Sequence, residues 1–547
     1  MTNKELLDNY LKNLNSIKLK WAQTPIKDKL NLLQSVKINL KKNSHHLVQI
    51  ISENKKIDHS ELFITEEWLT GPVILMKYLS QLQRTLQNNL KINLKIKKNN
   101  HNHYECQVLP YNFKDRLVWK GISAKIILQK GKEPTQGQHY FDAKFNGGCS
   151  LVLGAGNVSS IAPTDAIYKL FAENKVCLVK LNPVNDYLYD VFLEIFKPLI
   201  QLQVLYFIKG NVEDGKYLCE HKDIDDIHMT GSEQTHFKIV WGNDENLKTT
   251  QPLIQKQITS ELGCVTPVCI FPGLWSDKEL NYVANQFVGA MTNNASFNCN
   301  AFKVIVMSSE WKQKELFKNI LKQKLSGFPT RPAYYPGAQE RYNQILHENK
   351  NELIFQSKVT EKSHLPWTII ENLSPKKENI FFKRECFCSL FSIVEIHSQD
   401  IQDFSNKVLQ FYNEKLYGNL STSIFIDPKT KAENKKIWNQ FIEKLNYGCI
   451  GINCWAALSY AMGVTTWGAF PGNTLQNIKS GIGTVHNSFL IDFPEKSIVE
   501  APFYSSLTPL WVPYHKNGFK TSKSLLEYEY KPTLKNMFKL FYEGIQG

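Results

Sequence analysis

From Ser150 on, short apolar segments alternate with helix-like segments, and this alternation constrains the fold more than any other feature of the sequence. The apolar segments lie at residues 151–153, 176–181, 204–208 and 224–229. Residues 151–153 and 204–208 are apolar throughout, and residues 176–181 are apolar except for Lys180, which is typical of parallel strands covered on both faces. Helix-like segments at 164–173 and 185–200 separate them, and Asn185 is the predicted N-cap of the second. Because crossovers between parallel strands are right-handed, we expect a doubly wound, Rossmann-like unit.

A second set of apolar segments predicts a second α/β domain. Helix-like stretches at 280–291 and 311–325 separate some of its members, and the predicted strands are residues 268–271, 302–307, 389–394, 423–426 and 449–453. The first 90 residues show helical periodicity, whereas residues 91–145 contain turn-rich, alternating segments typical of an extended arm.

These sequence patterns predict an α/β fold with five parts, centred on a Rossmann-like domain and a second α/β domain. The expected boundaries are N-terminal helices at 1–103, a small β arm at 104–148, the Rossmann-like domain at 149–263, the second α/β domain at 264–485, and a tail with an extra helix at 486–547.

Composition excludes several classes of protein. With 42% hydrophobic and 21% charged residues, the chain is typical of a globular protein and not of a disordered or fibrous one. No apolar stretch approaches the roughly 20 residues of a membrane span, and the N-terminus lacks the apolar core of a secretory signal, so we expect a cytoplasmic protein. The net charge of +14 comes mainly from dispersed lysines, which argues against a nucleic-acid partner but suits a phosphate-bearing ligand. The Lys-rich run at 91–103 is predicted to be a solvated loop.

The eleven cysteines form no Cys-x-x-Cys pair and no zinc-site spacing, so no metal is expected. Most lie in apolar runs, where cysteine behaves as a small buried hydrophobe. Cys299 differs, because it follows the polar, small-residue segment 293–298. A thiol in such a segment is either an accessible nucleophile or one more buried spacer.

Two other short segments are ambiguous when taken alone. Gly154-x-Gly156 follows the first strand and is either a phosphate-binding turn or a plain tight turn, since the third glycine of the dinucleotide motif is missing. Glu261, in Glu-Leu-Gly-Cys264, is either a general base with a raised pKa or a surface carboxylate.

Taken together, these segments resemble the aldehyde dehydrogenase superfamily. Glu261-Leu-Gly-Cys264 resembles its Glu-Leu-Gly-Gly segment, and Asn294-Ala-Ser-Phe-Asn-Cys299 resembles its cysteine motif. The separation of Asn157 from Lys180 is similar to that of the family's oxyanion asparagine and cofactor lysine. The remaining motifs follow in the family's order: Thr230-Gly231-Ser232, Lys383-Arg-Glu385-Cys-Phe387, and Trp467-Gly-Ala-Phe-Pro-Gly with Ser480-Gly-Ile-Gly.

The resemblance implies oxidation of an aldehyde to a carboxylic acid through a thiohemiacetal and a thioester. In that reaction Cys299 would be the nucleophile, Glu261 would activate water, and Asn157 would stabilise the oxyanion. The implied cofactor is NAD or NADP, bound by Lys180, Gly231, Ser232, Glu385 and Phe387. The resemblance also implies that residues 149–263 are the nucleotide-binding domain, with the N-terminal helices packed on it, and that residues 264–485 are the catalytic domain. By position, segments 104–148 and 486–525 resemble the family's oligomerisation arm and tail, which implies a homodimer or homotetramer.

Departures from the family pattern leave some alternatives open. Pro183 replaces an acidic residue that favours NAD, so NAD and NADP both remain possible cofactors. Cys264 replaces a glycine, and Gly156 and Val158 replace the proline and tryptophan that flank the family's oxyanion asparagine. Cys386 and Cys388 lie within the motif around Glu385. The alternatives are an acyl-CoA reductase or CoA-acylating dehydrogenase, and a catalytically silent dinucleotide-binding scaffold. Retention of Glu261 favours hydrolysis.

Overall fold

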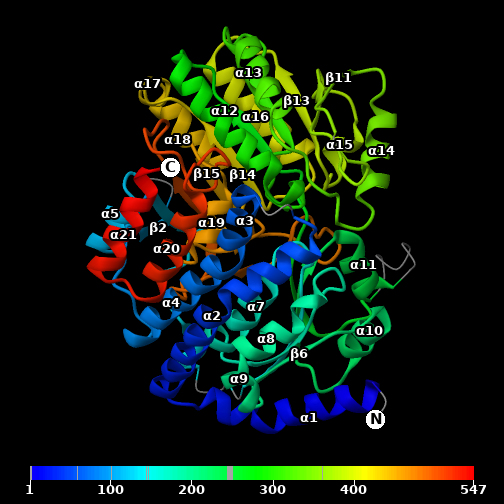
Figure 1. Ribbon diagram of the computed structural model, residues 1–547, viewed down its shortest axis with the longest axis vertical. Helices are drawn as coiled ribbons and strands as arrows, with labels where there is room; N and C mark the ends of the chain where they lie inside the picture. Colours follow the sequence, from blue (N-terminus) through cyan, green and yellow to red (C-terminus); the bar gives the residue numbers. More distant parts are fainter. Residues whose placement is uncertain are drawn as a thin grey trace.

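The computed structural model describes residues 3–57, 60–99, 102–142, 145, 147–242, 251–359 and 361–547. Within these residues, a six-stranded and an eleven-stranded sheet form the centres of two α/β lobes, one above the other in Figure 1. A short two-stranded sheet pairs β16 (Trp467–Gly468) with β18 (Thr484–Val485).

The lower lobe is the predicted Rossmann-like unit. Its sheet has the order β17-β8-β7-β4-β5-β6, parallel except for β17. The strands are β4 (Cys149–Leu153), β5 (Val176–Lys180), β6 (Leu205–Ile208), β7 (Asp226–Gly231), β8 (Gln257–Leu262) and β17 (Gly481–Ile482). The covering helices are α7 (Ile161–Ile167) with its π-helical extension Tyr168–Ala172, α8 (Tyr189–Ile195), α9 (Lys197–Gln201), α10 (Val212–Glu220) and α11 (Glu233–Trp241). The order of β4, β5 and β6 relative to β7 places a switch point beside β4, where doubly wound sheets bind their ligands.

Asn185 occupies the predicted N-cap position, but of a 3-10 turn, Asp186–Leu188, that leads into α8. Its side chain accepts no capping hydrogen bond. Instead, its buried Nδ2 donates to the carbonyl oxygen of Ala155 at 2.8 Å. The side-chain amide of Asn185 therefore supports the turn after β4. This hydrogen bond also gives the buried amide nitrogen the partner that it needs.

The upper lobe surrounds the eleven-stranded sheet, whose order is β1-β2-β3-β19-β15-β14-β9-β10-β13-β12-β11. Its parallel strands are β9 (Pro267–Ile270), β10 (Val304–Ser308), β12 (Thr368–Glu371), β13 (Leu390–Ile396), β14 (Ser421–Phe425) and β15 (Cys449–Ile452), and β11 (Leu353–Gln356) is antiparallel at the edge. The helices are α12 (Asp277–Thr292), α13 (Lys314–Ser326), α14 (Ala338–Glu348), α15 (Ile380–Lys383), α16 (Ile401–Gln410) with its π-helical extension Phe411–Lys415, α17 (Pro428–Glu433), α18 (Lys435–Lys444) and α19 (Ala457–Met462). A capping box of Ser276 and Glu279 fixes the start of α12.

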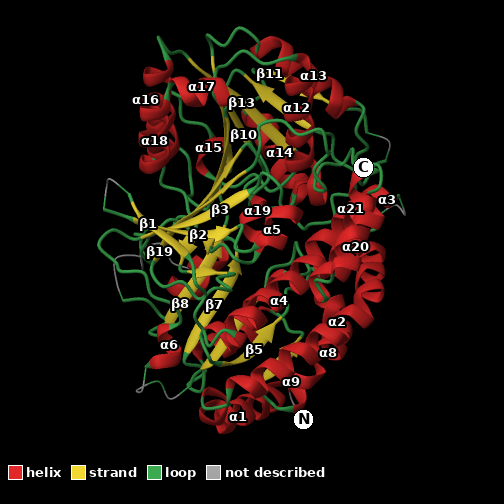
Figure 2. Cartoon of the chain, turned by 90° about the vertical axis from the view of Figure 1, so that its left-hand side faces the viewer, coloured by secondary structure: helices red, strands yellow, loops and turns green. Residues whose placement is uncertain are grey.

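The arm and the tail continue the large sheet within the same chain (Figure 2). β19 (Pro494–Glu500) pairs parallel with β15 and antiparallel with β3 (Ser123–Leu128), which in turn pairs with β2 (Tyr104–Leu109). The run at 91–103 is not the solvated loop that we predicted, because part of it forms the edge strand β1 (Lys95–Lys98). Its backbone pairs with β2 while its side chains stay exposed. The short helices α5 (Phe113–Val118) and α6 (Gln138–Phe141) complete the arm.

The N-terminal helices cover one side of both lobes. They are α1 (Asn3–Ala22), α2 (Ile26–Asn54), α3 (Glu61–Trp68), a π-helical turn Leu69–Val73, and α4 (Ile74–Gln87). α1 contacts β4 and β5, and α2 contacts α8 and α9. The C-terminal helix α20 (Gly518–Tyr530) lies against α3 and α4, with α21 (Leu534–Ile545) beyond it (Figure 1). Among the described residues, no helix has the length and apolar character needed to cross a membrane.

Candidate active site

Cys299 and Glu261 meet at the junction of the two lobes. Glu261 lies near the end of β8 in the Rossmann-like sheet, and Cys299 lies in the turn before β10 of the large sheet. The thiol donates to Glu261 Oε1 at 3.3 Å. All eleven cysteines lie in the described residues, and Cys299 alone among them is not fully buried. The sequence prediction that this thiol differs from the others is therefore correct, and the thiol has a carboxylate partner.

Burial determines the protonation of this pair. It raises the pKa of Glu261 from 4.5 to about 7. Burial also raises the pKa of the Cys299 thiol well above its usual value, and the neighbouring Glu261 and Glu385 carboxylates raise it further. The resting pair is thus a neutral thiol hydrogen-bonded to a carboxyl group that titrates near neutrality. Such a carboxyl group can accept a proton and release it again at physiological pH.

Asn157 adjoins the same turn from the other lobe. It follows β4, and its Nδ2 donates to the carbonyl oxygen of Phe297 at 2.9 Å. An amide nitrogen carries two protons, so one remains to donate to a further acceptor. The predicted nucleophile, base and oxyanion residue therefore lie together, although they come from three segments far apart in the sequence.

The turn that presents Cys299 has an unusual backbone. Asn294, Ala295 and Ser296 have φ values of 53°, 53° and 68°. Left-handed backbone at residues other than glycine costs about 1–3 kcal/mol each and persists only when surrounding contacts hold it. One such contact is the buried Lys303, whose Nζ donates to the carbonyl oxygens of Ser296 at 3.2 Å and Cys388 at 2.6 Å. On the far side, Thr266 Oγ1 donates to the carbonyl oxygen of Cys299 at 2.7 Å.

Three of the predicted cofactor residues lie at the carboxyl ends of β5 and β7, the two parallel strands on either side of β4. Lys180 ends β5 and Gly231 ends β7, while Ser232 is the N-cap of α11 and accepts from the Thr235 backbone N–H at 3.1 Å. Burial lowers the pKa of Lys180. Ligands of open α/β sheets bind at these strand ends, and helix N-termini favour phosphate groups. The arrangement therefore fits a dinucleotide.

Glu385 and Phe387 approach from the loop before β13. Burial raises the pKa of Glu385 to about 7, although the Lys303 ammonium opposes this rise. The Phe387 ring lies 5.8 Å from that of Phe297, measured between centroids, and φ at Phe387 is 41°. Glu385 fits here because residue 263 is glycine: a Cβ at that position would lie 2.7 Å from the Glu385 Cδ. The carboxylate and the phenyl ring thus reach the neighbourhood of Cys299.

The cysteine at position 264 does not obstruct the site. Its side chain is buried, with Sγ 4.0 Å from the carbonyl oxygens of both Tyr417 and Ser421. The position that tolerates no side chain is Gly263, and this glycine is retained. Cys386 and Cys388 are likewise buried, with their sulfur atoms 3.3 Å apart.

Comparison with known proteins agrees with this geometry. The model of the aldehyde dehydrogenase family matches residues 157–469, which is more than half of the chain. The chain belongs to the aldehyde dehydrogenase family. The matched segment begins at Asn157 and includes Glu261, Cys299 and Glu385.

Individual members of this family are only distantly similar to the chain. The rat mitochondrial methylmalonate-semialdehyde/malonate-semialdehyde dehydrogenase [acylating] is 24% identical over 265 residues, which cover 46% of this chain and 44% of that protein. The match thus spans less than half of that relative's length. The human counterpart is 23% identical over the same length.

Solved structures share the fold over nearly the whole chain. Glyceraldehyde-3-phosphate dehydrogenase GapN from Methanocaldococcus jannaschii, in complex with NADP, has a TM-score of 0.62 at 15% identity and covers 91% of this chain and 95% of its own. Substrate-bound AldH from Staphylococcus aureus has a TM-score of 0.61 at 15% identity, with 95% and 99% covered. The predicted fold class is therefore confirmed for this aldehyde dehydrogenase family member.

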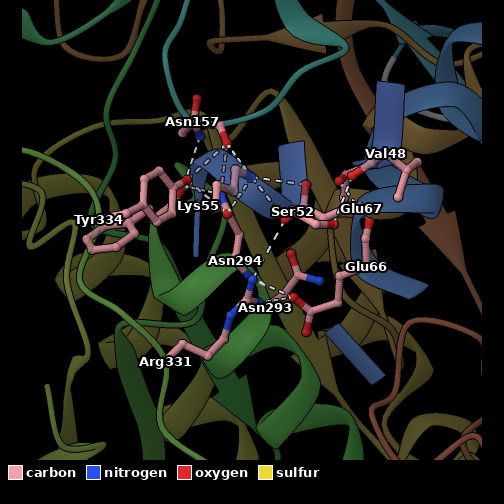
Figure 3. Close-up of polar contacts among 12 residues, drawn as sticks. Val48, Ser52, Lys55, Glu66, Glu67, Asn157, Asn293, Asn294, Arg331 and Tyr334 are labelled. Carbon is pink, nitrogen blue, oxygen red and sulfur yellow. Dashed lines mark hydrogen bonds and ion pairs between the residues drawn. The ribbon is translucent and has the colours of Figure 1, made fainter. Parts of the chain in front are cut away.

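Residues outside the predicted motifs also reach this site. Lys55 follows α2, Glu66 and Glu67 lie on α3, and Arg331 and Tyr334 lie between α13 and α14. Figure 3 shows these side chains converging on Asn157 and Asn294. The three helix-derived residues precede the part matched by the family model, and no motif in the sequence pointed to them. The sequence gives a signal only for Glu66 and Glu67, which are a pair of acidic residues among apolar ones in Ile64-Thr-Glu-Glu-Trp68.

Proposed function

We propose that this chain oxidises an aldehyde to the corresponding carboxylic acid, with NAD or NADP as the electron acceptor. The observation that carries this proposal is the hydrogen bond between Cys299 Sγ and Glu261 Oε1, 3.3 Å long, beside the Asn157 amide. Membership of the aldehyde dehydrogenase family supports it.

In the first half-reaction, Glu261 takes the thiol proton and the Cys299 thiolate adds to the aldehyde carbonyl. A tetrahedral thiohemiacetal forms, with negative charge on its oxygen. The second Nδ2 proton of Asn157 and the Cys299 backbone N–H would hold that charge, and loss of one such donor typically costs about 10²–10³ in kcat.

Several residues fit the cofactor and would orient it. Lys180 and the N-terminus of α11 at Ser232 and Gly231 would hold the ribose and phosphate groups, while Glu385 would accept from a ribose hydroxyl. The buried Glu385 Oε1 has no hydrogen-bond partner among the described residues, which suits such a role. Phe387 would lie against the nicotinamide ring. When bound, NAD or NADP supplies the hydride acceptor that converts the thiohemiacetal carbon into a thioester.

Glu261 then releases the thiol proton to solvent. In the second half-reaction, the Glu261 carboxylate takes a proton from water as the water oxygen adds to the thioester carbonyl. The Cys299 thiolate then leaves and takes that proton from Glu261, which restores the thiol and releases the carboxylic acid. A titration near pH 7 suits Glu261 to this double use, because the base must be free in each half-reaction.

A second candidate function shares the same thioester. The similar rat and human dehydrogenases are described as acylating, which favours transfer of the acyl group to a thiol such as CoA. The carboxylate at Glu261 favours water as the acceptor. Release of carboxylate or of acyl-CoA from the same aldehyde distinguishes the two.

We propose a cytoplasmic homodimer or homotetramer with no nucleic-acid partner. The free state of all eleven cysteines supports a reducing compartment. The support for an oligomer is the resemblance of segments 104–148 and 486–525 to the family's arm and tail. Light scattering of the purified protein tests it, and a monomer mass would contradict it.

The experiment that tests the proposed function is NAD(P)H formation with a panel of aldehydes. We expect aldehyde-dependent reduction by the wild type and none by Cys299→Ala, with cofactor affinity preserved within a few-fold. Turnover by Cys299→Ala would remove this residue from the mechanism.

A further inference from the structure

A buried ionic cluster lies directly beneath the candidate active site (Figure 3). Lys55 Nζ lies 3.0 Å from both carboxylate oxygens of Glu67, and Arg331 forms an ion pair with Glu66. The side chains of Lys55, Glu67 and Arg331 are 5%, 1% and 2% exposed. Charges buried this deeply are costly unless every one of them is paired and hydrogen-bonded.

The ammonium group of Lys55 reaches beyond its ion pair to the catalytic segments. It also donates to the carbonyl oxygen of Asn157 at 3.2 Å and to Asn294 Oδ1 at 3.0 Å. Its three N–H groups therefore serve three acceptors: Glu67, the oxyanion residue, and the turn that leads to Cys299. One cation thus connects two segments that come from different lobes.

The carbonyl oxygen of Asn157 is the centre of this arrangement. Besides Lys55, it faces Asn294 Nδ2 at 3.0 Å and the Tyr334 hydroxyl at 3.1 Å. The same hydroxyl lies 2.9 Å from Asn294 Oδ1. Three donors, from Lys55, Asn294 and Tyr334, thus fix the position of the Asn157 carbonyl oxygen.

Asn294 is also fixed by hydrogen bonds of both its backbone and its side chain. Its backbone N–H donates to Glu66 Oε2 at 3.0 Å, and its Nδ2 also lies 3.1 Å from the Phe297 carbonyl oxygen. Asn294 begins the left-handed stretch before Cys299, a conformation that needs such external support. The Glu66 and Lys55 contacts supply it from α3 and from the end of α2.

We propose that Lys55, Glu67 and Tyr334 are positioning residues that set Asn157 against the Cys299 turn for oxyanion stabilisation. This inference rests on the proposed roles of Asn157 and Cys299. Hydrophobic residues could fill the same space at less cost in desolvation, so stability alone does not explain a buried charge here. Geometry does, because a displacement of about 1 Å at a reacting group can cost about 10²-fold in rate.

The mildest test removes one hydroxyl. Tyr334→Phe keeps the ring, which lies 5.1 Å from that of Phe297 between centroids, and deletes only the donor to Asn157 and Asn294. We expect the first turnover of NAD(P)H formation to slow about fivefold, the equivalent of one lost hydrogen bond, with the KM for cofactor unchanged. An unchanged first turnover would contradict the role of Tyr334.

The stronger test removes the ion pair as a unit. Lys55→Met/Glu67→Gln leaves no unpaired buried charge, so it separates positioning from folding. We expect kcat to fall about 10²-fold while the melting temperature stays near that of the wild type. The matched control is Lys77→Met/Glu529→Gln, which removes an equally buried ion pair between α4 and α20 and should leave kcat unchanged. Equal kcat values in the two double variants would overturn the proposal.

A second readout needs no turnover. The rate at which iodoacetamide alkylates Cys299, followed by peptide mass, reports how firmly the turn is held. We expect Lys55→Met/Glu67→Gln to change this rate about tenfold and the control pair to leave it unchanged. If the wild type lacks dehydrogenase activity yet shows this difference, the proposed function fails and the positioning role stands. If the wild type is active and neither readout differs between the pairs, the positioning role fails and the function stands.

Discussion

Glu261 is buried near the end of β8, and burial raises its pKa to about 7. In the proposed reaction its active form is the carboxylate, since only the carboxylate can accept the thiol or water proton. We therefore expect kcat/KM to rise with pH through about 7 and then level, and a pH series of initial rates measures this.

Two variants identify the group responsible for that rise. Glu261→Gln should lose the rise in kcat/KM near pH 7. Glu385→Gln should keep that rise and change the KM for cofactor instead, although burial raises the pKa of Glu385 to about 7 as well.

The pH dependence of stability gives an independent check on Glu261. Because the folded-state pKa of Glu261 exceeds its unfolded value of 4.5, the folded state holds the proton more tightly between these values and loses stability as pH rises from about 4.5 to 7. Glu261→Gln should therefore gain stability relative to wild type over that window.

Lys180 is expected to act on binding and not on the chemical step. Lys180 is the last residue of β5, and its side chain lies close to Gly210 and Gly215, beside the strand ends where the cofactor would bind. Lys180→Ala should raise the KM for both NAD and NADP. The amount of NAD(P)H formed in the first turnover at saturating cofactor, which is the burst amplitude, should stay unchanged. A fall in burst amplitude would place Lys180 in the chemistry. The same kinetics compare the two cofactors. Because Pro183 stands in place of an acid, we expect kcat/KM with NADP to be at least as high as with NAD, and a hundredfold preference for NAD would contradict this.

The sequence predicted Cys299, Glu261, Asn157 and Lys180 because local motifs carry them. It did not predict Lys55 or Tyr334, and the reason is physical. Lys55 meets Asn294 across 239 positions of sequence, and such a contact leaves no local period or spacing. Buried charge at helix positions becomes informative only when the partner is known.

At the scale of elements, strands were predicted well where burial on both faces leaves a continuous apolar run, as in β5 and β10. β8 was missed because its sequence, Gln257-Ile-Thr-Ser-Glu-Leu262, mixes polar and apolar residues. Two of its polar side chains have polar partners: Glu261 Oε1 accepts from the Cys299 thiol, and Thr259 Oγ1 lies 2.9 Å from His228 Nδ1. Local rules fail most often where a strand carries a functional residue.

The connection from β8 to β9 gives a prediction at this scale. A Cβ at residue 263 would press on the Glu385 carboxylate, so Gly263→Ala should displace Glu385 and weaken cofactor binding several-fold. Fluorescence titration with NADPH or NADH measures the affinity. Gly327→Ala is the matched control, because its φ of −88° is ordinary and the atoms nearest to its Cβ lie 3.8 Å away. Equal cofactor affinities in the two variants would show that a Cβ at residue 263 does not displace Glu385.

At the scale of the whole molecule, the two ends of the chain support the same side of the protein. Lys77 on α4 and Glu529 on α20 form a buried ion pair of 2.9 Å, with both side chains 6% exposed. Removing one partner leaves an unpaired buried charge, which typically costs about 3–5 kcal/mol. Lys77→Met should therefore lower the free energy of unfolding by about that amount, as measured by denaturant titration.

Adding Glu529→Gln to Lys77→Met should restore much of the lost stability, since no charge is then left unpaired. The activity of each folded molecule should stay at the wild-type level in both variants, because this pair does not contact the candidate site. A single variant as stable as wild type would mean that the pair contributes nothing to holding α20 on α4.

The measurement that tests the central claim most directly uses Glu261→Gln in a single turnover. Glutamine keeps the shape and a carbonyl acceptor of the side chain but cannot take a proton from water. Because the variant also lacks the base for the thiol, the measurement is made at high pH, where hydroxide can deprotonate Cys299. The variant should then form one NAD(P)H per active site, and turnover should stop at the thioester. Mass spectrometry should find the acyl group on the Cys299 peptide. A full steady-state rate, or an acyl group on any other residue, would contradict the account.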